Sequence, residues 1–365
     1  MQPHATLRIH GDAIAENTRR LAAATDAIVM AVVKADGFGH GHAALRALDA
    51  GATRLGVASI DEALPLRWAG VSAPILSWLN PVDADADSAI RNDIELAVPS
   101  IAHLGAFATA AARVGKRALV HLHVDTGMAR DGAEAAEWRP LCELARAYEL
   151  RGLIRVVGIM SHLARADEPG DPLTVRQRLV FDAAVRTARR RGLTPRFAHL
   201  AATAATLTDR STHFDLVRVG AGLYGIDPSH TTELRGAMTL TARVTKVRDV
   251  PAATAVGYGW RYLTDRPTRL ALLPLGYADG IPRSLSPDAR AFVRGRRVPI
   301  AGTVSMDQLV IDVGDAGVEP GDEVVLFGQG DAGEPKIRDW AGWAGTIEHD
   351  IVTRIGPRVH VEEAA

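Results

Sequence analysis

The chain has 365 residues and a formal net charge of −1, with 47% hydrophobic and 23% charged residues. This balance is typical of a globular enzyme with a sizeable core, and it gives no reason to expect nucleic acid or an anionic membrane as a partner. Because Cys142 is the one cysteine, no intrachain disulfide can form, and the N-terminus lacks the apolar stretch of a signal peptide, so we expect a cytoplasmic location.

Short β-rich runs alternate with helical stretches over the first two-thirds of the chain. About eight such units in about 220 residues predict an N-terminal (β/α)8 barrel of the TIM type, within the α/β class. An open, doubly wound sheet is the alternative, but no G-x-G-x-x-G motif follows the first strand. The predicted strands are 27–33, 54–59, 74–78, 94–98, 118–124, 156–161, 197–200 and 216–219, and the predicted helices are 14–24, 42–50, one that begins at Asp61, 101–114, 133–150 and 174–191.

The pattern changes near residue 235, where Gly and Asp-Gly turns begin to separate strand-like runs. This texture predicts a second, C-terminal domain that is mostly β. We therefore expect a barrel of residues 11–232 and a mostly β domain of residues 1–10 and 233–365. The predicted elements of the second domain are strands at 238–247, 269–275, 297–301, 308–313 and 323–327 and one helix at 337–344.

Lys34 stands where the apolar run 31–33 ends and a glycine-rich turn begins. A cation at the end of a buried strand is costly to desolvate, so such a lysine loses its proton more readily than a surface lysine. The neutral amine is a nucleophile, which makes Lys34 a candidate for covalent catalysis. The alternative is a structural lysine whose ammonium reaches solvent from the strand end.

Other polar residues follow predicted barrel strands in the same way. Catalytic groups of such a barrel gather at the carboxyl ends of the strands, so we expect these side chains to share one face with Lys34. The set is rich in cations, and the glycine-rich turn 220–222 follows its last strand, as expected for a site that holds a phosphate-bearing anion. Each residue taken alone could instead be structural. The residues are Asp125, Arg130, His162, His199 and Arg218.

Six short motifs occur in order along the chain: AVVKADGFGHG at 31–41, VDTGM at 124–128, LVR at 216–218, GYG at 257–259, GYADG at 276–280 and MDQ at 306–308. With these motifs, the chain resembles alanine racemase, a pyridoxal phosphate (PLP) enzyme family with a barrel domain and a C-terminal β domain. The similarity covers almost the whole length. It implies an isomerase that interconverts L-alanine and D-alanine and, in a bacterium, supplies D-alanine for peptidoglycan.

The resemblance implies two catalytic bases. Lys34 would bind PLP covalently, and its freed amine would act as one base, while Tyr258 would be the other base on the opposite face of the cofactor. Racemisation needs such a pair, because one group removes the α-proton from one face and the other returns a proton to the other face. By the same resemblance, Lys34 handles the proton of the D-enantiomer and Tyr258 that of the L-enantiomer.

The resemblance also implies a set of cofactor-binding residues. Arg218 would face the pyridine nitrogen of PLP, and because an arginine stays protonated, the ring would remain an unprotonated and weaker electron sink. This favours reprotonation over side reactions. His162 would support Arg218, and Thr203, Gly220 and Ala221 would bind the cofactor. No metal is expected.

Five further residues would deal with the substrate, a small amino acid. Arg130 would lie near its carboxylate, where a bidentate guanidinium is useful, and Met306 would line the pocket through its backbone. Tyr277, Asp167 and Arg283 match residues that narrow the substrate entry.

The resemblance implies an assembly as well. In this family Tyr258 and Met306 reach the barrel of the partner subunit. We therefore expect an obligate homodimer whose active sites are shared between subunits.

The chain departs from the family pattern around the cofactor. Phe38 and His349 stand where tyrosines that contact the phosphate are usual, and each lost hydrogen bond costs roughly 1–3 kcal/mol if nothing replaces it. Ala202 stands where an asparagine is usual. His123 replaces a lysine that is often carbamylated, so Arg130 must be held in another way.

Three other readings remain open from the sequence. The first is a related racemase of altered or broader specificity, such as for serine. The second is a non-racemising PLP-binding protein of the same fold, although that reading predicts the absence of Tyr258 and of the C-terminal domain. The third is a barrel metal hydrolase that uses His40, His42, His162 and Asp125, for which His40-Gly41-His42 is a weak signal.

Overall fold

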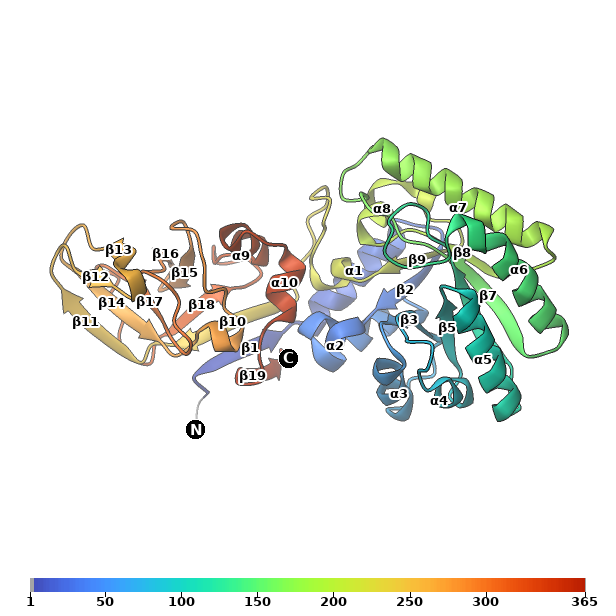
Figure 1. The fold of residues 1–365 in the computed structure, drawn as a ribbon. Coiled ribbons are helices and arrows are strands. Elements are labelled where there is room, and N and C mark those ends of the chain that lie inside the picture. Colours follow the sequence, from blue (N-terminus) through green and yellow to red (C-terminus); the bar gives the residue numbers. More distant parts are fainter. Residues whose placement is uncertain (1–2, 365) are drawn as a thin grey trace.

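The computed structural model describes residues 3–364 and places a barrel beside a mostly β domain (Figure 1). Eight parallel strands form the barrel in the order β8-β7-β6-β5-β4-β3-β2-β9. β9 pairs with β2, and a bridge from Ala202 to Arg218 joins the end of β8 to β9, so the sheet almost closes. The predicted TIM-type barrel is confirmed. Its strands are β2 (Ile28–Val32), β3 (Arg54–Val57), β4 (Ile75–Ser77), β5 (Ile94–Val98), β6 (Ala118–His123), β7 (Ile154–Met160), β8 (Phe197–His199) and β9 (Leu216–Val219).

Helices cover the outside of the barrel, so β3, β5 and β9 are buried at every position. Two helices begin at a serine that accepts a hydrogen bond from the first turn: Ser59 from the Glu62 N–H and Ser100 from the His103 N–H. Within residues 3–364, no helix combines the length and the apolar character needed to cross a membrane. The helices of this part are α1 (Gly11–Ala23), α2 (Lys34–Gly39), η1 (Gly41–Ala50), α3 (Ile60–Trp68), α4 (Ala86–Arg91), α5 (Ile101–Val114), α6 (Ala135–Leu150), α7 (Pro172–Arg190), α8 (Thr203–Thr208), η2 (Arg210–Thr212) and η3 (Ala221–Tyr224).

The second part confirms the predicted mostly β domain. Its main sheet has the order β16-β15-β18-β10-β1-β19, and two smaller sheets have the orders β11-β14-β17 and β12-β13. The N-terminal strand β1 belongs to this sheet, where it pairs with β10 and β19. The elements are β1 (Ala5–Ile9), β10 (Met238–Arg243), β11 (Lys246–Val250), β12 (Ala255–Val256), η4 (Tyr258–Trp260), β13 (Tyr262–Leu263), β14 (Thr268–Leu273), η5 (Tyr277–Asp279), β15 (Arg290–Val293), β16 (Arg296–Pro299), β17 (Leu309–Asp312), β18 (Glu323–Phe327), α9 (Ile337–Ala344), α10 (Glu348–Thr353) and β19 (His360–Glu363).

Two sequence predictions were wrong in detail. The predicted single strand 238–247 is two strands in different sheets, because the Val244 N–H bonds to Asp322 and the next amide, of Thr245, bonds to Leu272. The predicted helix 42–50 is the 3₁₀ helix η1, and α2 before it was not predicted. A switch of sheet and a left-handed turn both depend on distant partners, so the local pattern gave no sign of them.

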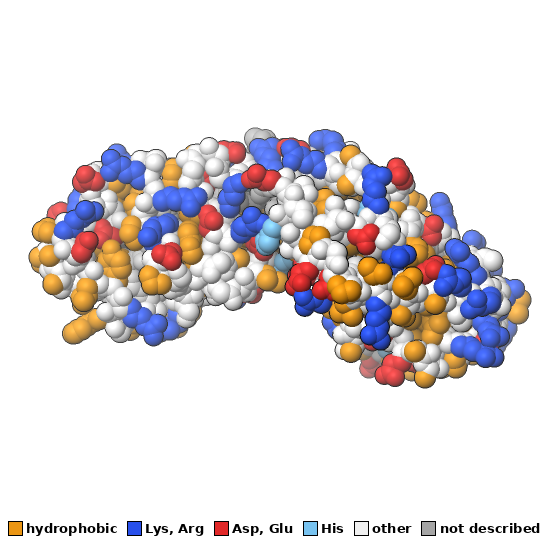
Figure 2. All heavy atoms as spheres, turned by 90° about the horizontal axis from the view of Figure 1, so that it is seen from above, with side chains coloured by type: hydrophobic (Ala, Val, Ile, Leu, Met, Phe, Trp, Pro, Cys, Tyr) orange, Lys and Arg blue, Asp and Glu red, His pale blue; other side chains and the backbone are white. Residues whose placement is uncertain are grey.

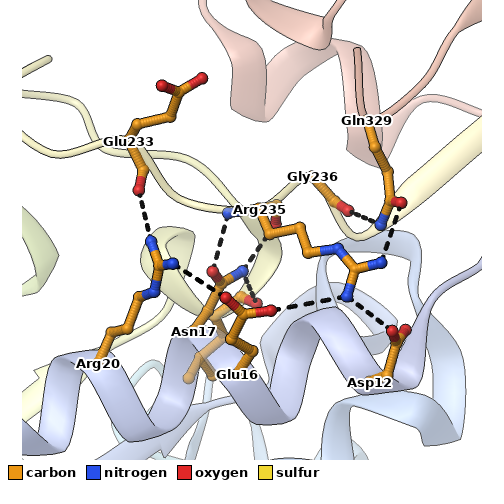
Figure 3. A network of polar contacts seen from close by, with 9 residues as sticks. Asp12, Glu16, Asn17, Arg20, Glu233, Arg235, Gly236 and Gln329 are labelled. Carbon is orange, nitrogen blue, oxygen red and sulfur yellow. Dashed lines mark hydrogen bonds and ion pairs between the residues drawn. The ribbon is translucent and has the colours of Figure 1, made fainter. Parts of the chain in front are cut away.

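A polar network joins α1 of the barrel to the chain that enters the second domain (Figure 3). The buried Asn17 amide donates to the carbonyl oxygens of Leu223 (3.1 Å) and Arg235 (2.7 Å) and accepts from the Arg235 N–H (2.9 Å). The Arg235 guanidinium forms an ion pair with Asp12 at 2.7 Å and donates to Gln329 Oε1 at 3.3 Å. Asn17 is therefore the buried centre of the junction between the two parts.

Replacing Asn17 with alanine should destabilise the protein by about 2–4 kcal/mol, because one buried and two half-buried backbone groups lose their partner. The matched control is Arg20→Ala on the same helix, where an exposed side chain pairs with Glu16 and donates to the exposed Glu233 carbonyl, and there we expect a change of about 1 kcal/mol or less. Chemical denaturation of both variants at one protein concentration measures the difference. Equal midpoints would show that the junction contributes nothing through Asn17.

Candidate active site

Lys34 lies two residues after the end of β2, at the carboxyl ends of the barrel strands, and begins α2. Its Nζ lies 6.0 Å from the centroid of the Phe38 ring. Burial lowers the pKa of Lys34, the Arg130 guanidinium lowers it further, and the Glu62 carboxylate opposes this. A half-buried lysine with a lowered pKa supplies a neutral amine more readily than an ordinary lysine.

The turn after Lys34 has a left-handed backbone at non-glycine residues. The φ angles of Ala35, Asp36 and Phe38 are 53°, 52° and 55°, a conformation that costs free energy unless its surroundings impose it. Glu62 supplies part of that constraint, since one carboxylate oxygen accepts from the Ala35 N–H (2.8 Å) and the other from the Ala58 N–H (2.7 Å). Glu62 was not predicted as a site residue, because it lies 27 residues from Ala35 and no local pattern indicates the contact.

Aromatic rings hold the same turn from the other side. Tyr224 stacks on Phe38 at 4.9 Å and on His40 at 4.4 Å, and its hydroxyl donates to the Val32 carbonyl at 3.2 Å. α10 of the second domain packs on α2, with the His349 ring 5.9 Å from that of Phe38. Phe38 is therefore a buried packing residue, consistent with its lack of a hydroxyl.

Arg218 lies on β9 and is buried. Its Nη1 donates to the carbonyl oxygen (2.9 Å) and to Nδ1 (3.0 Å) of His199, and its Nη2 donates to the Ser161 carbonyl at 2.6 Å and lies 3.3 Å from Nδ1 of His162. Burial and the nearby Arg130 lower the pKa of Arg218 to about 10, so it stays charged at neutral pH. Within residues 3–364, Nε of Arg218 donates no hydrogen bond and no carboxylate pairs with its guanidinium.

The two histidines beside Arg218 are neutral. Burial, followed by the charges of Arg218, Arg130 and Lys34, lowers the pKa of His162 to about 3. Burial and the Arg218 charge also lower the pKa of His199 well below its usual value. Lys34, Arg130, Arg218 and His162 therefore lie within electrostatic range of one another at this face of the barrel.

The loop after β6 is organised by a carboxylate. Asp125 accepts from the backbone N–H groups of Gly127, Met128 and Ala129 at 2.8–3.1 Å, so its role here is structural. This loop presents Arg130, which has no ion-pair partner in the described part of the chain. His123, on β6, lies 3.4 Å from the Asp131 carboxylate next to Arg130.

The residues present fit an anionic ligand that carries a phosphate. Lys34, Arg130 and Arg218 bring three positive charges together, and among residues 3–364 Glu62 is the carboxylate that acts on Lys34. Such a cluster is stabilised by a bound anion. Beside it, the Thr203 hydroxyl accepts from the N–H groups of Gly220 (3.2 Å) and Gly222 (3.1 Å), which brings the start of α8 against the turn that contains Ala221.

Within one polypeptide chain, the second-domain candidates Tyr258 and Met306 do not lie near Lys34. Tyr258 and Met306 are 68% and 54% exposed, and β12 and β13, which flank Tyr258, lie at the end of the domain away from the barrel (Figure 1). The Ala278 N–H, one residue after Tyr277, donates to the Met306 carbonyl, so these two candidates are close to each other. Arg283 is exposed on this domain, and Asp167 is exposed in the loop after β7.

The molecule is elongated and bent, with a concave side between its two parts (Figure 2). Within residues 3–364, no group of three or more His, Cys, Asp or Glu side chains is arranged to hold a metal ion. In particular, Nδ1 of His40 faces the carbonyl oxygens of Gly37 and Phe38 instead of other potential ligands.

Comparisons with known proteins agree on one family. The family model described as "Alanine racemase, N-terminal domain" matches residues 9–228, and "Alanine racemase, C-terminal domain" matches residues 237–362. The alanine racemase of Frankia casuarinae is 49% identical over 350 residues, which cover 94% of this chain and 91% of that protein.

Solved structures give the same result. The crystal structure of alanine racemase from D-cycloserine-producing Streptomyces lavendulae has a TM-score of 0.97 and 40% identity, covering 100% of this chain and 98% of that one. The structure of alanine racemase from Bartonella henselae with covalently bound pyridoxal phosphate has a TM-score of 0.89 and 28% identity, with full coverage of both chains. The chain therefore belongs to the alanine racemase family of enzymes.

Proposed function

We propose that this protein interconverts L-alanine and D-alanine with PLP as its cofactor. The observation that carries the proposal is the cluster at the carboxyl end of the barrel, where Lys34 has a lowered pKa and lies near Arg130 and Arg218. The related Bartonella henselae enzyme, which holds covalently bound pyridoxal phosphate, supports the choice of cofactor.

Five residues besides Lys34 would hold the cofactor. Bound PLP withdraws electrons from the substrate Cα and so makes the α-proton acidic. Lys34 would hold PLP covalently, and the free Nε–H of Arg218 would face its pyridine nitrogen, with His162 supporting the guanidinium. Thr203, Gly220 and Ala221 would bind the phosphate, since the Thr203 hydroxyl lies against the turn 220–222, where it accepts from the N–H groups of Gly220 and Gly222 on either side of Ala221.

Proton transfer would use Lys34 and Tyr258 on opposite faces of the substrate. Lys34 Nζ would remove or return the α-proton of D-alanine, and the Tyr258 hydroxyl would do so for L-alanine. Since Arg218 remains charged, it cannot take a proton from the cofactor ring, which limits electron withdrawal and favours prompt reprotonation at Cα.

The remaining candidates would bind and admit the substrate. Arg130 has no ion-pair partner within residues 3–364, so its guanidinium is available for the substrate carboxylate. Met306 would line the pocket, and Tyr277, Asp167 and Arg283 would narrow its entry.

A homodimer would complete each site. Tyr258, Trp260, Leu263 and Met306 are 68%, 74%, 62% and 54% exposed on the second domain, an apolar group that a single chain leaves in water. Placing this surface on the barrel of a second copy would bury it and would bring Tyr258 to the partner's Lys34.

The remaining parts of the proposal concern setting and organisation. A cytoplasmic enzyme of this kind would supply D-alanine for cell-wall peptidoglycan. The division into a barrel of residues 11–232 and a second domain of residues 1–10 and 233–365 is supported by the pairing of β1 with β10 and β19.

The test is a racemisation assay on the purified protein with added PLP. L-alanine, L-serine and several larger L-amino acids are supplied separately, and the D-enantiomer is measured by chiral chromatography. We expect a yellow protein, borohydride-stable labelling at Lys34 and the fastest turnover with alanine. A protein that takes up no PLP would refute the proposal, and a preference for serine would replace alanine as the substrate.

A further inference from the structure

A chain of buried hydrogen bonds crosses the inside of the barrel and ends at Arg218. On β5, Glu95 forms an ion pair with Arg54 of β3 and lies 2.8 Å from Nε2 of His121 on β6. Nδ1 of His121 lies 2.9 Å from Nε2 of His199, and Nδ1 of His199 lies 3.0 Å from Nη1 of Arg218. Both histidines are 0% exposed, so water does not compete for these contacts.

The chemistry of the two ends determines where each proton lies. Arg218 can only donate, so Nδ1 of His199 must accept. Because Nδ1 accepts, the ring proton of neutral His199 lies on Nε2, and burial together with the Arg218 charge lowers the pKa of His199 well below its ordinary value. That N–H donates to Nδ1 of His121, which leaves the His121 proton on Nε2, where it is donated to the Glu95 carboxylate.

Glu95 suits the role of terminal acceptor. Burial alone would raise its pKa, but the hydrogen bond from His121 and the Arg54 guanidinium lower the pKa to about 2, so Glu95 is a carboxylate at every ordinary pH. A carboxylate can only accept, so Glu95 fixes which nitrogen donates and which accepts in each hydrogen bond between it and Arg218. Burying an ion pair such as Glu95–Arg54 is costly, and a role in fixing the hydrogen-bond directions would account for its presence inside the barrel.

The barrel makes room for this chain at one glycine. A Cβ added at Gly158 would lie 2.2 Å from Nδ1 of His121, and the φ angle of Gly158 is not among the positive values that favour glycine. The register of β6 and β7 shifts between Val120 and His121, which places Gly158 opposite His121. The His121 imidazole occupies the space that a side chain at position 158 would need.

We propose that Glu95 and His121 are positioning residues for Arg218, acting through His199 to keep Nδ1 of His199 an acceptor and so to hold the guanidinium in place. The inference rests on the proposed function, in which Arg218 faces the pyridine nitrogen. Without the Glu95 carboxylate, both histidines can take the other tautomer and the hydrogen bonds between them can reverse. The Nδ1–H of His199 would then point at an N–H of Arg218.

The first test reads the protons directly. A two-bond ¹H–¹⁵N spectrum of the PLP-loaded protein labelled with ¹⁵N-histidine distinguishes protonated from bare ring nitrogens, with His121→Gln and His199→Gln for assignment. We expect the wild-type protein to carry the proton on Nε2 of both rings. A proton on Nδ1 of His199 in the wild type would overturn the proposal, and this readout does not depend on turnover.

The second test uses Glu95→Gln, which keeps the shape but can both donate and accept. We expect His121 and His199 to show mixed or reversed tautomers. We also expect kcat to fall by up to about tenfold while KM stays within about threefold of the wild-type value, because Arg218 is no longer held in one position. Glu149→Gln is the control. The Glu149 carboxylate is 14% exposed and pairs with Arg146, which is not part of the hydrogen-bonded series from Glu95 to Arg218, so this substitution should leave kcat unchanged.

Gly158→Ala gives an independent variant that changes no charge. The added methyl group should displace His121 and lower kcat in the same direction, whereas Gly105→Ala, whose Cβ would meet nothing within 4 Å, should not. Wild-type kcat and tautomers in Glu95→Gln would reject the role of Glu95. A wild-type protein that racemises no amino acid would instead reject the proposed function, while the tautomers would still decide the direction of the chain.

Discussion

Lys34→Ala is expected to abolish both covalent PLP binding and racemisation. Borohydride treatment of the variant with PLP should leave no stable label, because the other three lysines lie elsewhere: Lys116 precedes β6, and Lys246 and Lys336 belong to the second domain. Turnover should fall by about 10³-fold or more, since the variant loses a proton-transfer group as well as the covalent link. Chiral analysis of the product and mass spectrometry of the reduced protein measure the two effects.

Two controls separate this role from general damage. Lys116→Ala removes a surface lysine that pairs with Asp93, and it should keep the colour and the rate. Because burial and Arg130 lower the pKa of Lys34, its neutral fraction at a given pH exceeds that of an ordinary lysine, so PLP capture by the cofactor-free protein should rise at lower pH than for a free lysine. Arg130→Met should move that rise upward in pH. A Lys34→Ala variant labelled at another lysine would contradict the assignment.

Tyr258→Phe is expected to lower racemisation by about 10²- to 10⁴-fold, the range of a general acid or base, and to leave the colour intact. The loss should depend on the enantiomer supplied. In deuterated water the variant should still exchange the α-proton of D-alanine, which Lys34 removes, and should fail to exchange that of L-alanine. Nuclear magnetic resonance of the recovered amino acid measures both. Tyr148→Phe, which removes a hydroxyl from α6 far from the proposed dimer surface, is the matched control and should leave both exchange rates unchanged.

Mixed dimers test whether the two bases come from different chains. Lys34→Ala and Tyr258→Phe are each nearly inactive, but a dimer that contains one of each has one site with both native residues. Random mixing should restore about a quarter of wild-type activity, because half of the dimers are mixed and each has one intact site of two. No recovery after subunit exchange would indicate that both bases belong to one chain, and would remove the shared site.

Much of the fold was available from the sequence because it depends on local patterns. The buried strand β5 and the helix α5 have the bounds predicted for them, since an apolar run and a serine cap act within a few residues. Lys34 was identifiable for the same reason, as a cation placed directly after an apolar strand. The order of the six motifs along the chain identified the family.

The left-handed turn after Lys34 and the partners that stabilise it were not predictable in this way. Glu62 lies 27 residues from Ala35, and Tyr224 lies still farther from Phe38 along the chain, so both contacts form only when the barrel elements pack together. Similarly, Glu95 and His121 looked like ordinary residues of buried strands, and their hydrogen bond exists because β5 and β6 are neighbours in register.

The sequence by itself therefore determined the order of elements, the barrel class and the residue at the centre of the candidate site, because propensity and burial pattern act over short windows of chain. The tertiary structure decided which charges lie together at the carboxyl ends of the barrel strands, and hence the lowered pKa of Lys34 and the acceptor that His199 offers to Arg218. Those properties depend on burial and on distances between residues remote in sequence, which no local window contains.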